Sequence, residues 1–224
     1  RDTQRICETH IRFWHGEGKT TGRVAAPVHD RYVFMLNAVD NGYGGLEHRH
    51  STALIAQRSD LPRVGEGKTS EGYMTLLGLI SHEYFHTWNV KRLRPREFER
   101  YDWARENHTT LLWFFEGLTS YYDDLLLRRS GLMDNTRYVQ GLNKTINQVL
   151  QTPGRHVHSL AESSFEAWTK YYRADDNTPN ITVSYYTKGA LVGLCLDLRL
   201  RQSGHSLDAV MRGLWQRCHG GPMG

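Results

Sequence analysis

The first third of the chain is patterned as strands and loops. Residues 32–36 and 51–57 are apolar runs of strand length, and the first is bounded by Asp30 and Asn41. Between them lies the glycine-rich segment 42–45, which permits close backbone approach. It is not a phosphate-binding loop, because no Gly-Lys-Ser/Thr follows it.

Beyond about residue 70 the apolar residues adopt helical spacing. One apolar face repeats at i, i+3, i+4, i+7 and i+11 and consists of Tyr73, Leu76, Leu77, Ile80 and Tyr84. Further helical patterns are expected at about 110–129, 136–150, 162–171, 186–202 and 206–218. Gly131 is the expected stop of the first of these, and Ser206 is the expected N-cap of the last. Strands followed by a run of helices favour an α+β architecture.

The composition excludes several classes of protein. The 224 residues are 39% hydrophobic and 23% charged, which excludes wholesale disorder and allows one or two domains. No apolar run approaches the ~18 residues of a membrane span. The net charge of +4 is concentrated in the basic segment 91–96, so it does not indicate a nucleic-acid partner. Three cysteines far apart exclude a disulfide scaffold and a cysteine zinc knot.

The ends of the chain indicate a fragment. It begins without methionine or a charged-then-apolar leader, and it stops just after a helical pattern. We therefore expect a longer parent protein. The sequence does not distinguish a cytoplasmic from a periplasmic location for it.

The strongest chemical signal is the H-E-x-x-H pattern of residues 82–86 within the predicted helix. Four residues advance a helix by ~400°, so the imidazoles of His82 and His86 project from one face toward a single ion. Glu83 sits one residue off that face, placed to polarise a metal-bound water. The pattern predicts zinc binding, the alternative being two solvated histidines with Glu83 as an ion-pair partner.

A zinc site with two histidines needs a third protein ligand. A third histidine at metzincin spacing is absent, so a carboxylate is expected, and Glu106 and Glu116 compete. Glu116 lies in the apolar segment 111–117, where a bound cation would remove the cost of burying a carboxylate. Glu106 has polar neighbours and needs no metal. The context favours Glu116, with an ion pair to an arginine as the alternative explanation.

Three longer segments, HEYFHTWNVKRLRP, LLWFFEGLTSYYDDLLL and SYYTKGAL, resemble the M61 family of glycyl aminopeptidases, gluzincins related to the M1 aminopeptidases. The resemblance spans about Tyr43 to Arg217. It implies a thermolysin-like catalytic domain with a small mixed β-sheet followed by a mainly helical subdomain. On this basis residues 1–68 would be the strand-rich part and residues 69–224 the helical part with the zinc site. The family's long gap before the E-G-x-T segment also supports Glu116.

The resemblance also implies a substrate-binding segment. Gly44-Gly45-Leu46-Glu47-His48 resembles the G-x-M-E-N segment of M1 enzymes, whose backbone pairs with the peptide and whose glutamate binds the free α-amino group. Gly44, Gly45 and Glu47 are the matching residues. Leu46 and His48 depart from the M1 pattern.

The resemblance also implies a catalytic role for Tyr186. It lies in Y-x-K-G-A, whose tyrosine hydroxyl stabilises the oxyanion in M1 enzymes, and adjacent Tyr185 is the alternative. Five other histidines are not expected to bind zinc; these are His48, His50, His108, His156 and His158.

The expected function is hydrolysis of the N-terminal bond of peptide substrates. Zinc held by His82, His86 and Glu116 would activate water, and Glu83 would move the proton to the leaving amine. The family implies a preference for N-terminal glycine or alanine. A zinc endopeptidase of thermolysin type and a non-catalytic peptide-binding module remain alternatives.

Overall fold

The computed structural model describes residues 1–17, 27–63, 65 and 69–223 of the chain. They form two compact units. Unit 1 consists of Arg1–Thr87 and Tyr122–Asn135, and unit 2 of Trp88–Tyr121 and Thr136–Gly224. The chain mixes a small sheet with many helices, as expected for an α+β protein.

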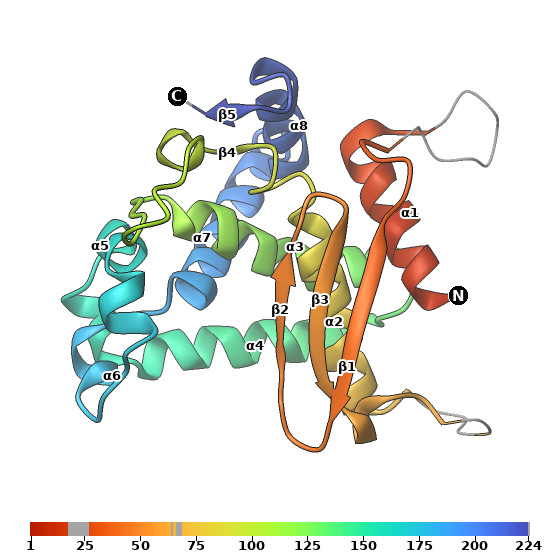
Figure 1. The fold of residues 1–224 in the computed structure, drawn as a ribbon, viewed down its shortest axis with the longest axis horizontal. Coiled ribbons are helices and arrows are strands. Elements are labelled where there is room, and N and C mark those ends of the chain that lie inside the picture. The colour runs from red at the N-terminus through yellow and green to blue at the C-terminus, as the bar shows by residue number, and fades with distance from the viewer. Residues whose placement is uncertain (18–26, 64, 66–68, 224) are drawn as a thin grey trace. The chain divides into compact units, whose positions relative to one another are not determined.

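Unit 1 contains a three-stranded mixed sheet. Its strands are β1 (Val33–Val39), β2 (Gly44–Glu47) and β3 (Ser51–Gln57), in the order β1-β3-β2. β3 runs parallel to β1 and antiparallel to β2. Alternate residues of β3 are buried, and the sheet packs against helix α2 (Glu71–Phe85) (Figure 1). The apolar runs at 32–36 and 51–57 therefore correspond to β1 and β3.

Helix α1 (Asp2–His15) corrects the expectation of strands and loops throughout the first third of the chain. Its buried residues have helical spacing, but the polar His10 lies in the middle of them and hides the pattern. The ring nitrogens of His10 lie 2.9 Å from the Ile6 carbonyl oxygen and 3.0 Å from that of Ser81, a residue of α2. A polar side chain with these partners can be buried in the contact of α1 with α2.

Aromatic rings form much of the core of unit 1. The rings of Phe85, at the end of α2, and Tyr122 stack with their centroids 5.2 Å apart. Phe13 of α1 packs against both, at 5.7 Å and 4.8 Å. These contacts fix the end of α2, where the H-E-x-x-H pattern lies.

Unit 2 is mainly helical. Its segments are the π-helical turns η3 (Trp113–Gly117) and η5 (Ala167–Tyr171), the 3-10 helices η2 (Arg96–Phe98) and η4 (Pro153–His156), and the helices α5 (Leu160–Phe165), α6 (Thr178–Ile181), α7 (Tyr185–Gln202) and α8 (Leu207–Arg217). The short strands β4 (Arg94–Pro95) and β5 (Pro222–Met223) pair in parallel. The completely buried Phe115 of η3 packs in an apolar cluster with Val90 and Leu93.

The remaining elements are η1 (Arg58–Asp60), α3 (Leu118–Arg129) and α4 (Asn135–Gln151). The helices expected from the sequence are present, although two of them include π-helical turns: 110–129 contains η3, and 162–171 ends in η5. Gly131 follows α3 with φ +74°, and the Ser206 side chain accepts a hydrogen bond from the Ala209 N–H, as expected for a stop and an N-cap. Across the described ranges, no helix is long and apolar enough to cross a membrane.

Candidate active site

The H-E-x-x-H residues lie at the C-terminal end of α2. This helix is capped at its other end by Ser70, whose side chain accepts from the Tyr73 N–H at 3.0 Å. His82 lies in its last turn and His86 is its C-cap residue. The two imidazole centroids are 4.7 Å apart, so both rings lie on one side of the helix, as the spacing predicts.

The orientation of His82 is fixed by Asp123. The Nδ1 atom of His82 lies 3.0 Å from the Asp123 Oδ2 atom. When Asp123 is ionised, its carboxylate can only accept from the Nδ1–H of His82, which leaves the Nε2 lone pair for a metal. Burial raises the pKa of the Asp123 carboxyl, and the neighbouring His82 opposes that rise. The Asp124 N–H also donates to Asp123, at 2.6 Å.

Asp123 is a site residue that the sequence reasoning missed. It follows Glu116 by two helical turns, and residues at that separation share a helix face. That spacing was the available signal, because a carboxylate that supports a histidine ligand is a common feature of metal sites.

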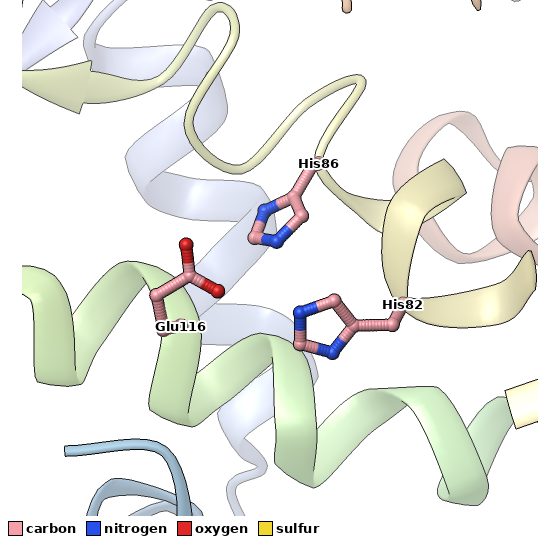
Figure 2. Close-up of side chains that lie close together, drawn as sticks. All are labelled: His82, His86 and Glu116. Carbon is pink, nitrogen blue, oxygen red and sulfur yellow. The ribbon is translucent and has the colours of Figure 1, made fainter. Parts of the chain in front are cut away.

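Glu116 is brought together with the two histidines. The ligand atoms offered by His82, His86 and Glu116 all lie within 4.8 Å of one another. Figure 2 shows the Glu116 carboxylate and the two imidazole rings pointing toward a common point. Glu106, the competing carboxylate, belongs instead to an exposed loop at 102–107. Two imidazoles and one carboxylate are the donor set of a catalytic zinc site, so the residues fit the expected metal.

A close backbone contact places Glu116 within unit 2. A Cβ atom built on Gly117 would lie 2.6 Å from the Gly189 Cα atom, and one built on Gly189 would lie 2.8 Å from the Trp113 carbonyl oxygen. Only glycines allow η3 and α7 to approach so closely. The contact joins the segment that contains Glu116 to the segment that contains Tyr186.

Tyr185 and Tyr186 occupy the first turn of α7, behind the N-cap Ser184. Their ring centroids are 4.6 Å apart. Burial raises the pKa of the Tyr186 hydroxyl, and the negative charge of Glu116 raises it further. The hydroxyl is therefore protonated at neutral pH and able to donate a hydrogen bond.

Glu83 packs against the glycine-rich strand β2. Its side chain is 5% exposed, and a Cβ atom built on Gly45 would overlap its carboxylate. Gly45 and Glu47 pair with Leu54 and Thr52, two buried residues of β3, so they share the face of β2 toward α2. Gly44 alternates with them, and a Cβ atom built on it would meet no atom of the described residues within 4 Å.

The histidines set aside by the sequence analysis have other surroundings. The Nδ1 atom of His108 lies 2.7 Å from the Phe165 carbonyl oxygen, and that of His48 lies 3.1 Å from the Leu46 carbonyl oxygen. His158 bridges Glu166 and the Val183 N–H. His50 and His156 are exposed. Among the described residues, none of these five belongs to the His82–His86–Glu116 group.

Comparison with known proteins assigns the family. A family model described as M61 glycyl aminopeptidase matches residues 75–192, more than half of the chain and including both the H-E-x-x-H pattern and Tyr186. The chain belongs to the M61 family of peptidases. The resemblance noted in the sequence is thereby confirmed.

A solved structure is also similar. It is described as an aminopeptidase N family protein from Idiomarina loihiensis, and it is 45% identical to this M61 chain with a TM-score of 0.90. The match covers 97% of this chain and 36% of the other. The M61 chain thus spans about a third of the length of that relative.

Proposed function

We propose that this M61 chain, residues 1–224, is the catalytic domain of a zinc-dependent aminopeptidase with a thermolysin-like gluzincin arrangement. The observation that carries the proposal is the grouping of His82, His86 and Glu116 within 4.8 Å. Membership of a peptidase family supports it. The substrates are peptides with a free N-terminus.

The donor set supports zinc as the cofactor. His82, His86 and Glu116 would hold it, and the Asp123 carboxylate would keep the His82 ring in the orientation and tautomer that binding requires. When bound, zinc supplies a Lewis acid that activates water and polarises a carbonyl at neutral pH.

Glu83 is the proposed general base and acid. Its carboxylate takes the proton of the attacking water and returns it to the amine that leaves. Burial against Gly45 holds the carboxylate in place and keeps bulk water away from it. A positioned group of this kind contributes about 10²–10⁴-fold to rate.

Tyr186 is the proposed oxyanion stabiliser. Its neighbourhood keeps the phenol protonated, so it can donate a hydrogen bond to the carbonyl oxygen as negative charge develops. Its place next to Glu116 in unit 2 supports this role, because the carbonyl undergoing attack must lie near the metal ligands.

β2 and Glu47 are the proposed substrate-binding elements. β2 is an edge strand, so the backbone around Gly44 and Gly45 can pair with an extended peptide. Glu47 lies on the face of β2 shared with Gly45 and would bind the free α-amino group through a charge-assisted hydrogen bond. The M61 family name supports a preference for N-terminal glycine, and alanine is the next smallest residue.

A pair of peptides tests this function. We expect an alanine-led tripeptide to be cleaved at its first bond, and the N-acetylated form to lose about 30-fold or more in kcat/KM, because Glu47 then lacks its ammonium partner. Glu47→Ala should impair the free peptide strongly and the acetylated one hardly at all. Equal cleavage of the two by the wild-type protein would instead indicate an endopeptidase. Zinc binding without cleavage of either would indicate a peptide-binding module.

A further inference from the structure

A third tyrosine lies with Tyr185 and Tyr186. Tyr172 is the residue at which the π-helical turn η5 ends. Its hydroxyl oxygen lies 3.4 Å from that of Tyr186 and 3.5 Å from that of Tyr185. All three residues belong to unit 2. Tyr172 is therefore the shared neighbour of the two tyrosines between which the sequence could not choose.

The backbone of η5 explains how Tyr172 reaches them. Adjacent residues of a regular helix point in directions about 100° apart and do not face the same neighbour. Here the Tyr171 ring packs against the rings of Tyr185 and Tyr186, with centroids 4.9 Å and 5.7 Å away, and the Tyr172 hydroxyl still reaches both hydroxyls. The π-helical turn and its end at Tyr172 bring two consecutive tyrosines to the start of α7. Such turns are frequent at functional sites.

The number of hydrogens limits which hydroxyl can donate to which. Each phenol has one hydrogen to donate. The Tyr185 hydroxyl donates to the Tyr172 oxygen. Either hydroxyl of the Tyr172–Tyr186 pair could donate. When Tyr172 donates, Tyr186 accepts and its own hydrogen is turned away from Tyr172. Hydrogen bonds in such a chain polarise one another, so the last hydroxyl becomes a stronger donor.

The three residues also differ in exposure, since Tyr185 is buried, Tyr186 is half-buried and Tyr172 is exposed. Tyr185 is 1% exposed, and Tyr172 is 66% exposed. Tyr185 is enclosed by the protein, which suits the first donor in this series of hydrogen bonds. The negative charge of Glu116 raises the pKa of both Tyr185 and Tyr186, after the larger effect of burial, so both hydroxyls stay protonated. The contacts at 3.4–3.5 Å are long, as catalytic hydrogen bonds often are before substrate binds.

We infer that Tyr172 is a positioning residue for the proposed reaction: its hydroxyl orients that of Tyr186 and makes Tyr186, not Tyr185, the donor to the oxyanion. The inference rests on the proposed function. It adds a residue that neither the sequence motifs nor the metal group includes. Because Tyr172 acts through Tyr186, its contribution must vanish when the Tyr186 hydroxyl is removed.

A double-mutant cycle tests this dependence. In the zinc-loaded protein with an alanine-led tripeptide, Tyr172→Phe should lower kcat about two- to tenfold, the worth of one hydrogen bond, and leave KM within about twofold. In the Tyr186→Phe background the same change should have no further effect. Tyr101→Phe, which removes a hydroxyl elsewhere in unit 2, is the matched control and should behave as wild type. An equal loss from Tyr172→Phe in both backgrounds, or a larger loss from Tyr185→Phe than from Tyr186→Phe, would overturn the inference.

A measurement without turnover separates this inference from the proposed function. With ¹³C-labelled tyrosine rings, Tyr172→Phe should shift the ζ-carbon resonance of Tyr186 and leave that of Tyr101 unchanged. An unmoved Tyr186 resonance would overturn the inference even in an active peptidase. A shifted resonance in a protein that cleaves no peptide would show that the proposed function has failed while the hydrogen bond exists, and the positioning role would fail with it.

Discussion

Removal of the Asp123 carboxylate should weaken zinc binding without removing a ligand. In the Asp123→Ala variant the Nδ1–H of His82 loses the acceptor that lies 3.0 Å away. The His82 ring can then rotate and exchange tautomers, so a larger share of the metal-free protein has the wrong nitrogen directed at the metal position. Second partners of histidine ligands contribute about 10–100-fold to metal affinity, which equals about 1.4–2.7 kcal/mol.

The effect on the metal-free protein should be different. Burial raises the pKa of Asp123, so its ionised form is disfavoured there by desolvation. Loss of the carboxylate removes both the desolvation penalty and the hydrogen bond to His82. These two effects oppose each other, so the free energy of unfolding of the metal-free protein should change less than the free energy of zinc binding. The selective effect on zinc affinity distinguishes a metal-supporting role from a purely structural one.

Competition with a chromophoric chelator measures the change. We expect Asp123→Ala to raise the zinc Kd by about 10–100-fold, and Asp134→Ala, at an exposed position of unit 1, to leave it unchanged. The zinc-induced rise in Tm should shrink in parallel in Asp123→Ala, because ligand stabilisation follows affinity. A zinc Kd within about threefold of wild type would refute the assignment of Asp123.

Three further changes have defined outcomes. Glu83→Gln should retain zinc and lose about 10²-fold or more in kcat, and wild-type turnover in this variant would remove Glu83 from the mechanism. Gly45→Ala should lower kcat with zinc content intact, because the added Cβ atom would overlap the Glu83 carboxylate. Gly213→Ala, at an open helical position, is the control. Equal kcat values in the two variants would contradict the reasoning. Burial and the charge of Asp123 raise the pKa of Asp124 to about 7, so the native metal-free protein binds a proton there that the unfolded chain releases near pH 4. The contribution of Asp124 to the free energy of unfolding should therefore fall between about pH 4 and 7, and Asp124→Asn should remove that contribution in denaturant titrations. A variant with the same pH dependence as the wild type would count against it.

The sequence was most informative where the apolar period was regular. β3 and α2 lie where the apolar run at 51–57 and the helical spacing beyond residue 70 placed them, and helical spacing also predicted that both histidines of H-E-x-x-H share one face. α1 was missed because the buried His10 occupies a core position, and only the three-dimensional contact with Ser81 shows why that position can be polar. Burial of a polar residue depends on a partner that is distant in sequence.

The π-helical turns were also beyond sequence reasoning. η3 and η5 differ from α-helix in backbone register, and the apolar patterns at 110–129 and 162–171 do not reveal that difference. The shift in register matters for the site, since η3 carries Glu116 and η5 leads to Tyr172. The Gly117–Gly189 contact joins two motifs that were recognised separately, and no spacing rule related one to the other.

The identity of the third ligand tests the central claim most directly. Zinc content should be measured by atomic emission after exhaustive dialysis, on wild-type protein, Glu116→Gln and Glu106→Gln. Because Glu116 lies with His82 and His86 within 4.8 Å and Glu106 lies in an exposed loop, we expect one zinc per chain in the wild type and in Glu106→Gln, and loss of zinc in Glu116→Gln. Full zinc retention by Glu116→Gln, or loss of zinc in Glu106→Gln, would contradict the account.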